Sequence, residues 1–217
     1  ASDVYKRQMK DLIERRLADP TLPMEEAFSQ QLKEEKLELP AGQFALFMNS
    51  MYAVDAYVRD YFRKAVLDAL LAEKLPVTVF GEGWEKYSCG DEHSLRREPA
   101  VPFALSFERI AKAHVLLNVS PIFNRGMHDR VPAGMANHAV VLTDENPYLR
   151  RTFTDGKELL FYSLEKPDTL FEQAERALTD VRLREKIAAS AYETFEREYT
   201  WKHRAEQILA FAEEVEA

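Results

Sequence analysis

The 217-residue sequence contains a single cysteine, Cys89, so it cannot form an internal disulfide and nothing indicates an oxidising compartment. It has no apolar run close to the ~20 residues that cross a bilayer, and no basic-then-apolar start resembling a signal peptide. Lys and Arg number 29 against 37 Asp and Glu, a net charge of -8. That balance argues against a broad nucleic-acid surface, which needs clustered cations. We therefore predict a soluble, cytoplasmic protein that binds no nucleic acid.

Glycine is scarce, and the glycine-rich phosphate-binding patterns are incomplete. Gly81 and Gly83 follow a short apolar segment, but Lys86 stands where the dinucleotide fingerprint has its third glycine. The pattern ending in Gly-Lys-Ser/Thr is absent, as is the Gly-x-Ser-x-Gly elbow of hydrolases. NAD enzymes, ATPases of those kinds and such hydrolases are disfavoured, and a plain tight turn explains Gly81 and Gly83 equally well.

A metal site is weakly indicated. Cys89 and His93 flank Asp91 and Glu92, all of which are residue types that bind metals. A zinc site needs three or four ligands, however, and the sequence has no second Cys-x-x-Cys or His pair to complete one. A polar surface loop is the better interpretation, and we predict no metal and no cofactor.

The N-terminal part of the sequence is helical in character. The first 40 residues are charged and predict two helices interrupted at residues 19–23. A longer pattern over residues 43–74 predicts one helix, or two that meet near Asn49. We expect a helical extension over residues 1–42 and one domain over residues 43–217. The chain begins at Ala1, and because residues 1–8 resemble translated adapter sequence we expect them to be non-native and a preceding part to be missing.

Short apolar segments alternate with helical patterns in the rest of the chain. Hydrophobic residues make up 46% of the whole sequence, which permits a large core. We predict four strands, over residues 77–80, 114–119, 139–142 and 158–162. Residues 86–98 predict a loop, and three helices end the chain. This alternation predicts an α/β fold with a parallel sheet. Ligands of such sheets bind at the carboxyl ends of the strands.

Polar and charged side chains concentrate in residues 118–130, between a predicted strand and a predicted helix. The free N–H groups of a helix N-terminus favour phosphate. Arg130 or Arg125 could add bidentate bonds to the same phosphate, and His128 could donate to a phosphate or sugar oxygen. For Asp129 we favour the interpretation that it caps the helix. The segment therefore predicts a phosphate site with Arg130 as its main cation.

Several motifs resemble group 1 glycosyltransferases of the spore-maturation-protein-like branch, over about residues 45 to 212. They include Asn-Val-Ser-Pro at 118–121, Gly-Met-His-Asp-Arg at 126–130, Ala-Val-Val-Leu-Thr-Asp at 139–144 and Thr-Trp-Lys-His-Arg-Ala at 200–205. The resemblance implies a GT-B enzyme, in which two Rossmann-like domains face each other across a cleft. This chain resembles the C-terminal, donor-binding domain, a three-layer α/β/α unit with a parallel sheet.

By this resemblance, the enzyme transfers a sugar from a nucleotide-diphosphate sugar to an unknown acceptor, such as a glycan, without a metal. The missing N-terminal domain would bind most of the acceptor. Arg130 would stabilise the leaving diphosphate and His128 would orient it or the sugar, so both are candidate catalytic residues. The resemblance implies donor contacts for Gly81, Gly83, Trp84, Asn118, Asn124, Arg125, Gly126, Asp129, Thr143, Asp144 and Tyr148.

The sequence departs from the family pattern at a few positions. The pair of Glu residues that binds ribose in many relatives falls here on Arg125 and Ala133. Gly134 costs about 1 kcal/mol relative to alanine in a helix, and His138 replaces a glycine where φ can be positive. A degenerate module that binds a glycan or partner without catalysis is therefore the alternative, and a sugar-nucleotide epimerase is a third hypothesis. We expect no transfer by this chain alone.

Overall fold

The first part of the chain forms four helices in a computed structural model that describes residues 2–216; Ala1 lies outside the described residues. They are α1 (Ser2–Ala18), α2 (Met24–Glu34), α3 (Ala41–Ser50) and α4 (Tyr52–Ala72). Pro20 and Pro23 lie between α1 and α2, where the missing N–H of proline stops a helix from continuing. The pattern over residues 43–74 is thus two helices, which meet at Met51.

Strands and helices alternate through the rest of the described chain. The strands are β1 (Val77–Phe80), β2 (Leu95–Glu98), β3 (Val115–Asn118), β4 (Val140–Asp144) and β5 (Leu160–Tyr162). The helices are the 3-10 helix η1 (Trp84–Lys86), α5 (Phe103–Ile110), α6 (Arg130–Ala136), α7 (Pro147–Thr152), α8 (Pro167–Thr179), α9 (Val181–Glu198) and α10 (Trp201–Glu216). The predicted α/β class with a helical N-terminal extension is confirmed.

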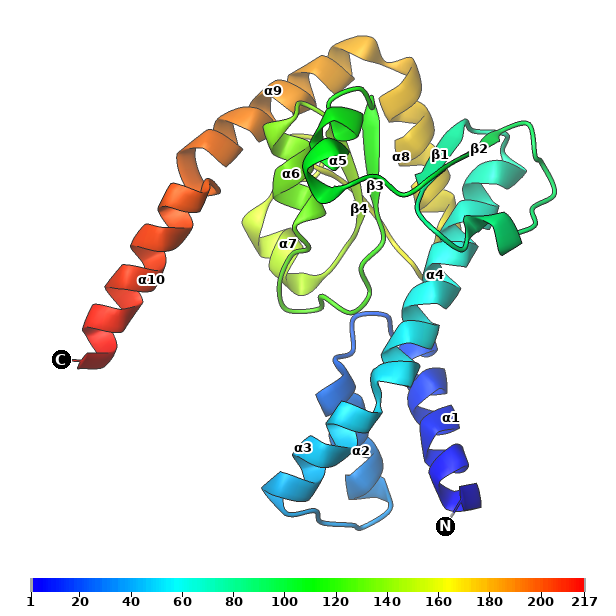
Figure 1. The fold of residues 1–217 in the computed structure, drawn as a ribbon, viewed down its shortest axis with the longest axis vertical. Helices are drawn as coiled ribbons and strands as arrows, with labels where there is room; N and C mark the ends of the chain where they lie inside the picture. The colour runs from blue at the N-terminus through cyan, green and yellow to red at the C-terminus, as the bar shows by residue number, and fades with distance from the viewer. Residues whose placement is uncertain (1, 217) are drawn as a thin grey trace.

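The strands β3, β4 and β5 form a parallel sheet in that order, between two layers of helices (Figure 1). Helix α8 covers one face, with α4 packed against α8, and α6 and α9 cover the other face. Successive side chains of a strand point to opposite faces. Val140 and Leu142 accordingly pack in the core with α4 and α8, whereas Val141 and Phe161 pack with α6 and α9. The result is the three-layer α/β/α arrangement predicted for this domain.

The stretch predicted as a loop, residues 86–98, contains a strand. Its last four residues form β2, which pairs in parallel with β1 so that Leu95 lies opposite Val77. These two strands form a sheet separate from β3, β4 and β5. Only Leu95 is apolar in the sequence Leu-Arg-Arg-Glu of β2, so no hydrophobic pattern marked it as a strand.

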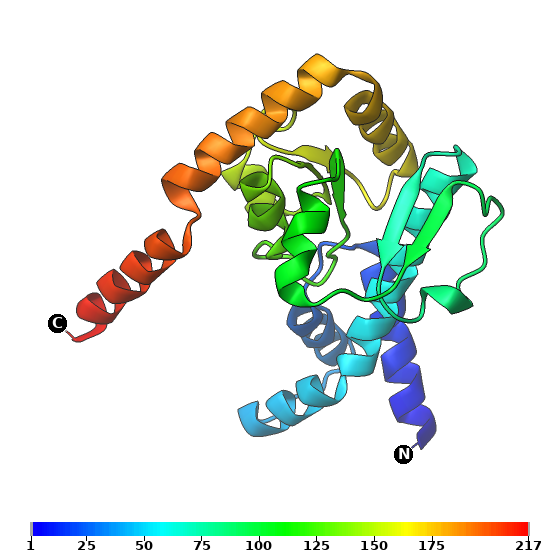
Figure 2. The same cartoon turned by 45° about the horizontal axis from the view of Figure 1, so that its top comes forward.

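The N-terminal helices share a hydrophobic core with the α/β part. Leu12 of α1 and Phe28 of α2 belong to the same cluster of buried side chains as Val54 and Val58 of α4, and that cluster continues to Leu142 in β4. Figure 2 shows α1, α2 and the first half of α4 side by side below the three-stranded sheet. Helix α4 thus joins the two parts, and the domain boundary after residue 42 stays a prediction.

Three helices are followed by a non-glycine residue with left-handed backbone geometry: Lys36 (φ 55), Lys74 (φ 57) and His138 (φ 56). After α4, the Lys74 N–H donates to the Leu71 carbonyl oxygen at 3.0 Å, and the Leu75 N–H donates to the Leu70 carbonyl oxygen at 3.1 Å. This is the Schellman arrangement, in which glycine is preferred. The positive φ expected at His138 is present.

Replacing Lys74 with glycine is expected to raise the free energy of unfolding by roughly 0.5–1 kcal/mol. A left-handed residue with a Cβ costs about 1–2 kcal/mol, and the greater freedom of glycine in the unfolded chain offsets part of the gain. Equilibrium urea denaturation measures the change. Lys74→Ala removes the same exposed side chain but keeps the Cβ, so equal stability of the two variants would contradict the argument.

Candidate functional site

The carboxyl ends of β3, β4 and β5 carry a buried polar network. The strand register places Asn118 beside Thr143 and Asp144 beside Tyr162. Asn118 Nδ2 donates to Thr143 Oγ1 at 2.9 Å, and the Tyr162 hydroxyl donates to the Asn118 carbonyl oxygen at 2.9 Å. Buried hydrogen bonds of this kind fix side chains in one arrangement. The network therefore holds the three strand ends in register at the edge where ligands of such sheets bind.

Asp144 is a buried carboxyl at this edge, with only 3% of its surface exposed. The Ser120 N–H donates to its Oδ1 at 2.8 Å, and the Ser120 hydroxyl donates to Asn118 Oδ1 at 2.9 Å. Burial raises the pKa of Asp144 to about 7, although the Ser120 N–H and the positive charge of Arg130 act in the opposite direction. Asp144 therefore changes its charge near neutral pH.

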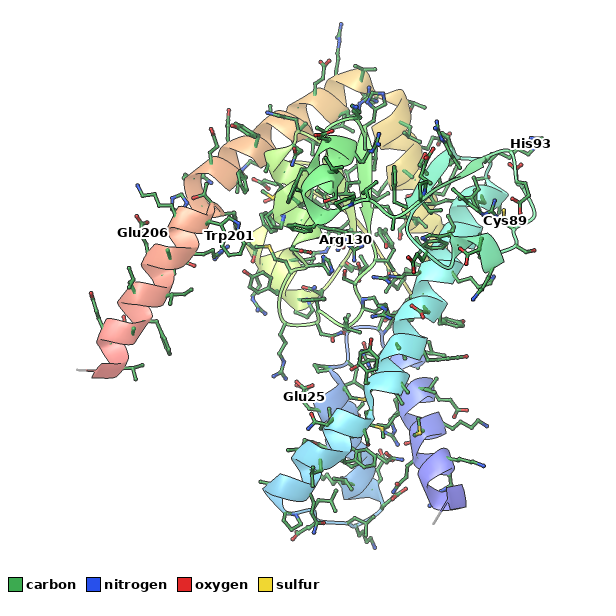
Figure 3. The ribbon with its side chains drawn as sticks, viewed as in Figure 1. Glu25, Cys89, His93, Arg130, Trp201 and Glu206 are labelled. Carbon is green, nitrogen blue, oxygen red and sulfur yellow. The ribbon has the colours of Figure 1, made fainter. Side chains whose placement is uncertain are left out.

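Two arginines, Arg63 and Arg130, place positive charge beside this network. Arg130 is the first residue of α6 and lies in the centre of the molecule, below the three-stranded sheet (Figure 3). Burial lowers the pKa of Arg130, and the nearby charge of Arg63 on α4 lowers it further. Burial is also the main cause of the lowered pKa of Arg63. Among the side chains of residues 6–215 no salt bridge joins either guanidinium to a carboxylate, although the charges of Asp129 and Asp144 act on Arg130 and that of Asp60 acts on Arg63.

His128 holds Arg130 in place. Arg130 Nη2 lies 3.2 Å from His128 Nε2. The Arg130 backbone N–H also donates to His128 Nδ1 at 3.1 Å, so Arg130 contacts both nitrogens of the ring. The Asp129 carboxylate lies against Nδ1 as well. Burial, followed by the charge of Arg130, lowers the pKa of His128, which favours the neutral ring.

The capping interpretation of Asp129 is wrong. Asp129 does occupy the position before α6, but its side chain makes no capping hydrogen bond there. Its backbone is already helical (φ -59, ψ -21), whereas a capping residue is normally extended. The carboxylate turns to His128 instead and orients that ring.

A cavity of about 330 Å³ opens next to Asp144. Most of its lining residues are polar, and they come from the loops after β3, β4 and β5, from α7 and from the loop between α1 and α2. They comprise Pro20, Thr21, Ser120, Pro121, Asn124, Asp144, Glu145, Asn146, Pro147, Arg150, Ser163, Leu164, Glu165 and Lys166. Its size is at the lower end of the range for small-molecule sites.

Two asparagines fix the loops around the cavity. Asn146 Oδ1 accepts from the Leu149 N–H at 2.8 Å and caps α7, while its Nδ2 donates to the Phe123 and Gly126 carbonyl oxygens at 2.8 and 3.1 Å. Asn124 Nδ2 donates to the Pro20 carbonyl oxygen at 2.8 Å. The cavity walls are therefore bound to one another, including the wall that comes from the N-terminal helices.

Residues 59–210 match the family model described as glycosyl transferase-like. The chain belongs to this glycosyl transferase-like family. No curated protein matches the chain.

Two solved structures of HepE from Anabaena resemble the domain, one in complex with UDP-glucose and one with UDP and glucose. Their TM-scores are 0.59 and 0.56, at 12% and 13% identity. Each comparison covers 69% of this chain and 44% of the HepE chain, so the chain spans less than half of that protein's length. The likeness shows the Rossmann-like fold of GT-B glycosyltransferases.

The structure of the glycosyl transferase-like domain separates some residues that the sequence assigned to one site. Gly81 (φ 128) and Gly83 (φ 90) form the tight turn after β1, where their backbone geometry requires glycine. Trp84 packs against Leu67 and Leu71 of α4. No hydrogen bond among residues 2–216 connects these three residues to Arg130, and their contacts with a donor stay predictions.

Two other candidates face different neighbours. Arg125 forms an ion pair with Glu26 of α2, which draws it toward the N-terminal helices. Tyr148 lies on α7, a helix that the sequence did not predict, and lines a groove with the end of α9 and the start of α10. Asn118, Asn124, Thr143 and Asp144 by contrast lie at the edge of the three-stranded sheet, as the sequence predicted for a common site.

Sequence reasoning missed Arg63. It follows Phe62 in an amphipathic helix, and a single arginine there is indistinguishable from a solvated one. Its proximity to Arg130 depends on how α4 packs against the sheet, which no local pattern reports. Tyr162 was likewise assigned only to a strand, although its hydroxyl binds the Asn118 carbonyl oxygen.

The loop around Cys89 and His93 lies on the outer side of the molecule, at the right of Figure 3. Its polar groups bind one another: the Cys89 thiol contacts Glu92, and Glu92 pairs with Arg97. Within the described chain, no group of three or more His, Cys, Asp or Glu side chains is arranged to hold a metal ion. Among the same residues no helix is both long and apolar enough to cross a membrane.

Proposed function

We propose that this domain is the donor-binding half of a glycosyltransferase and that it binds a nucleotide-diphosphate sugar at the carboxyl ends of β3, β4 and β5. The observation that carries the proposal is the pair of half-buried guanidiniums, Arg63 and Arg130, that form no salt bridge with a carboxylate among the side chains of residues 6–215. A diphosphate supplies the missing negative charge, and guanidinium matches phosphate oxygens in bidentate geometry. That HepE was solved with UDP-glucose supports this choice of ligand.

The chemistry that these residues can perform is leaving-group stabilisation. Transfer breaks the bond between the sugar C1 and a diphosphate oxygen, and negative charge develops on that oxygen. Arg130 and Arg63 lie in a partly buried site where such charge is stabilised more strongly than in water. His128 accepts from the Arg130 backbone N–H and lies against the Arg130 guanidinium, and so orients that side chain. The proton of the acceptor hydroxyl goes to a base that we assign to a second domain if the enzyme is inverting.

The cavity beside Asp144 suits the hydroxyl-rich part of a donor. Asp144 and Glu145 bring carboxylates and Asn146 brings an amide to its wall. Carboxylates accept hydrogen bonds from sugar hydroxyls, the task that the family's Glu pair performs on ribose. We propose that these residues replace the acidic side chains that Arg125 and Ala133 lack.

A second domain is also part of the proposal. Helix α10 extends away from the body of the molecule (Figure 1) and exposes an apolar stripe that includes Trp201 (89% exposed), Ile208 and Val215. A helix normally buries such a stripe against a partner. We assign this face to the acceptor-binding domain of the same enzyme, with a glycan among the candidate acceptors and the spore-maturation-like branch as the narrower family.

Calorimetric titration with UDP, GDP and their sugars tests donor binding. Arg130→Ala and Arg63→Ala are each expected to weaken binding of the preferred nucleotide about 10- to 100-fold, because a hydrogen bond to a charged group contributes roughly 1.5–3 kcal/mol. Arg182→Ala, at the exposed start of α9, is the matched control and should bind like the unchanged chain. The proposal is contradicted if no nucleotide or nucleotide sugar gives binding heat, or if Arg130→Ala and Arg182→Ala bind with equal affinity.

A non-catalytic binding module remains the second candidate. The observation that favours it is Arg125, which is engaged with Glu26 rather than free to contact a donor. This module would bind a glycan or a partner without catalysis, so a transfer assay on the full-length product separates the two candidates. Sugar transfer by that protein rules out the module.

A further inference from the structure

Helix α10 turns its polar side toward the body of the molecule. A groove of about 590 Å³ lies between α7, the end of α9 and the start of α10. Its lining is mainly polar and consists of Tyr148, Thr152, Arg197, Glu198, Tyr199, His203, Arg204, Glu206, Gln207 and Ala210. Trp201 and Ile208 are exposed to solvent instead. The contact between α10 and the body is therefore not a hydrophobic one, and the groove between them is open to a polar ligand.

Arg204 has an unused donor in this groove. Its guanidinium lies over the ring of Tyr199, 4.9 Å from the centroid, and its Nη1 donates to Gln207 Oε1 at 2.7 Å. Its Nη2 is buried and has no hydrogen-bond partner among the described residues. A buried charged donor without a partner is costly, so the structure favours an acceptor at this point.

The other charges of the groove are already neutralised. Arg197 pairs with Glu198 at 2.7 Å, and Glu206 pairs with Lys202 at 3.9 Å. The neighbours of Arg204, Tyr199 and Gln207, are uncharged. Burial raises the pKa of Tyr199 to about 12, so its hydroxyl keeps its proton and can donate. Arg204 is therefore the positive charge in the groove that has no anionic partner within residues 2–216.

We propose that this groove binds an oxyanion, the carboxylate or phosphate group of a small ligand. The group accepts from the Arg204 guanidinium, whose Nη2 turns toward the groove when the group binds, and the hydroxyls of Tyr148 and Tyr199 are further donors. The site differs from the proposed donor site: Asn146 and Pro147 face the cavity beside Asp144, whereas Tyr148 and Thr152 on the same helix face this groove. The proposal does not depend on glycosyl transfer. Its rival is a purely structural Arg204 that braces the junction of α9 and α10 and binds only water.

NMR titration of the ¹⁵N-labelled chain with inorganic phosphate and, separately, with acetate tests the site at constant ionic strength. The Arg204 Nε–Hε signal is expected to shift saturably in the millimolar range. Tighter saturation by phosphate identifies a phosphate ester as the ligand class, and equal or tighter saturation by acetate identifies a carboxylate. Arg204→Lys keeps the charge without the planar fork and should weaken binding about tenfold, and Arg204→Gln should abolish it.

The matched control is Arg182→Gln, an exposed arginine at the opposite end of α9, which should leave the titration unchanged. Because the unchanged chain is itself titrated, the result stands even if an Arg204 variant loses α10, which circular dichroism would detect. A linear response of Arg204 to both anions, the same as that of Arg182, overturns the proposal and leaves Arg204 as a brace.

Discussion

Replacing Gly134 with alanine is expected to lower the free energy of unfolding by roughly 1–3 kcal/mol, the opposite of the gain that this change brings in an exposed helix. Gly134 lies in α6 where that helix crosses β4 and β3. A Cβ there would lie 2.4 Å from Val141 Cγ2 and 3.0 Å from Leu116 Cδ2. Val141 is fully buried and stiff at χ1, so it cannot move aside cheaply.

Chemical denaturation of two glycine variants gives the comparison. Gly42 lies in the first turn of α3, and a Cβ built on it meets nothing within 4 Å. Gly42→Ala should therefore stabilise the chain while Gly134→Ala destabilises it. In a double-mutant cycle, Gly134→Ala should cost less when Val141 is also alanine, because the two side chains then no longer overlap. A stabilising Gly134→Ala would show that α6 can move away from the sheet without cost.

Replacing Asp144 with asparagine is expected to stabilise the domain above pH 7 and to flatten its stability between about pH 4 and 7. The pKa of Asp144 is about 7 in the folded protein, against ~3.9 for an unfolded aspartate. Between these values the folded state binds more protons than the unfolded state, so the free energy of unfolding falls as pH rises. At about 1.4 kcal/mol per pH unit the decline amounts to a few kcal/mol. Asparagine keeps an Oδ1 acceptor for the Ser120 N–H and carries no charge.

Urea denaturation at a series of pH values between 4 and 8 measures this effect. Glu108→Gln, an exposed change on α5, removes a carboxylate without touching the network. Its free energy of unfolding should fall with rising pH as that of the unchanged chain does. Parallel profiles for Asp144→Asn and the unchanged chain would show that the Asp144 carboxyl ionises as easily in the folded state as in the unfolded one.

Much of the fold follows from hydrophobic patterns in the sequence. The apolar segment that became β4 is buried, while half-buried and exposed residues alternate in β1, and the three C-terminal helices begin close to where their apolar periodicity predicts. The exceptions share a physical cause. Strand β2 is mostly charged and depends on pairing with β1, while α7 is short and depends on its cap Asn146. Neither segment has a hydrophobic pattern long enough to predict its secondary structure.

The residues of the candidate site also divide into those that sequence patterns predict and those that depend on packing. Asn118, Thr143 and Asp144 could be placed together because each ends a buried strand, and parallel strands end at one edge of a sheet. Arg63 could not, because its role depends on the packing of α4 against that edge. Gly134 was interpreted as a weak helix residue, although its small size is what lets α6 approach β4.

The wall formed by Pro20 and Thr21 lies outside residues 59–210, the part that matches the family model. The cavity is therefore shaped partly by helices that the family does not define. Two family members with identical strand ends but different N-terminal helices would present cavities of different size and polarity. Ligand preference can thus diverge within the family by changes in the α1–α2 loop, with Arg63, Arg130 and the sheet left untouched.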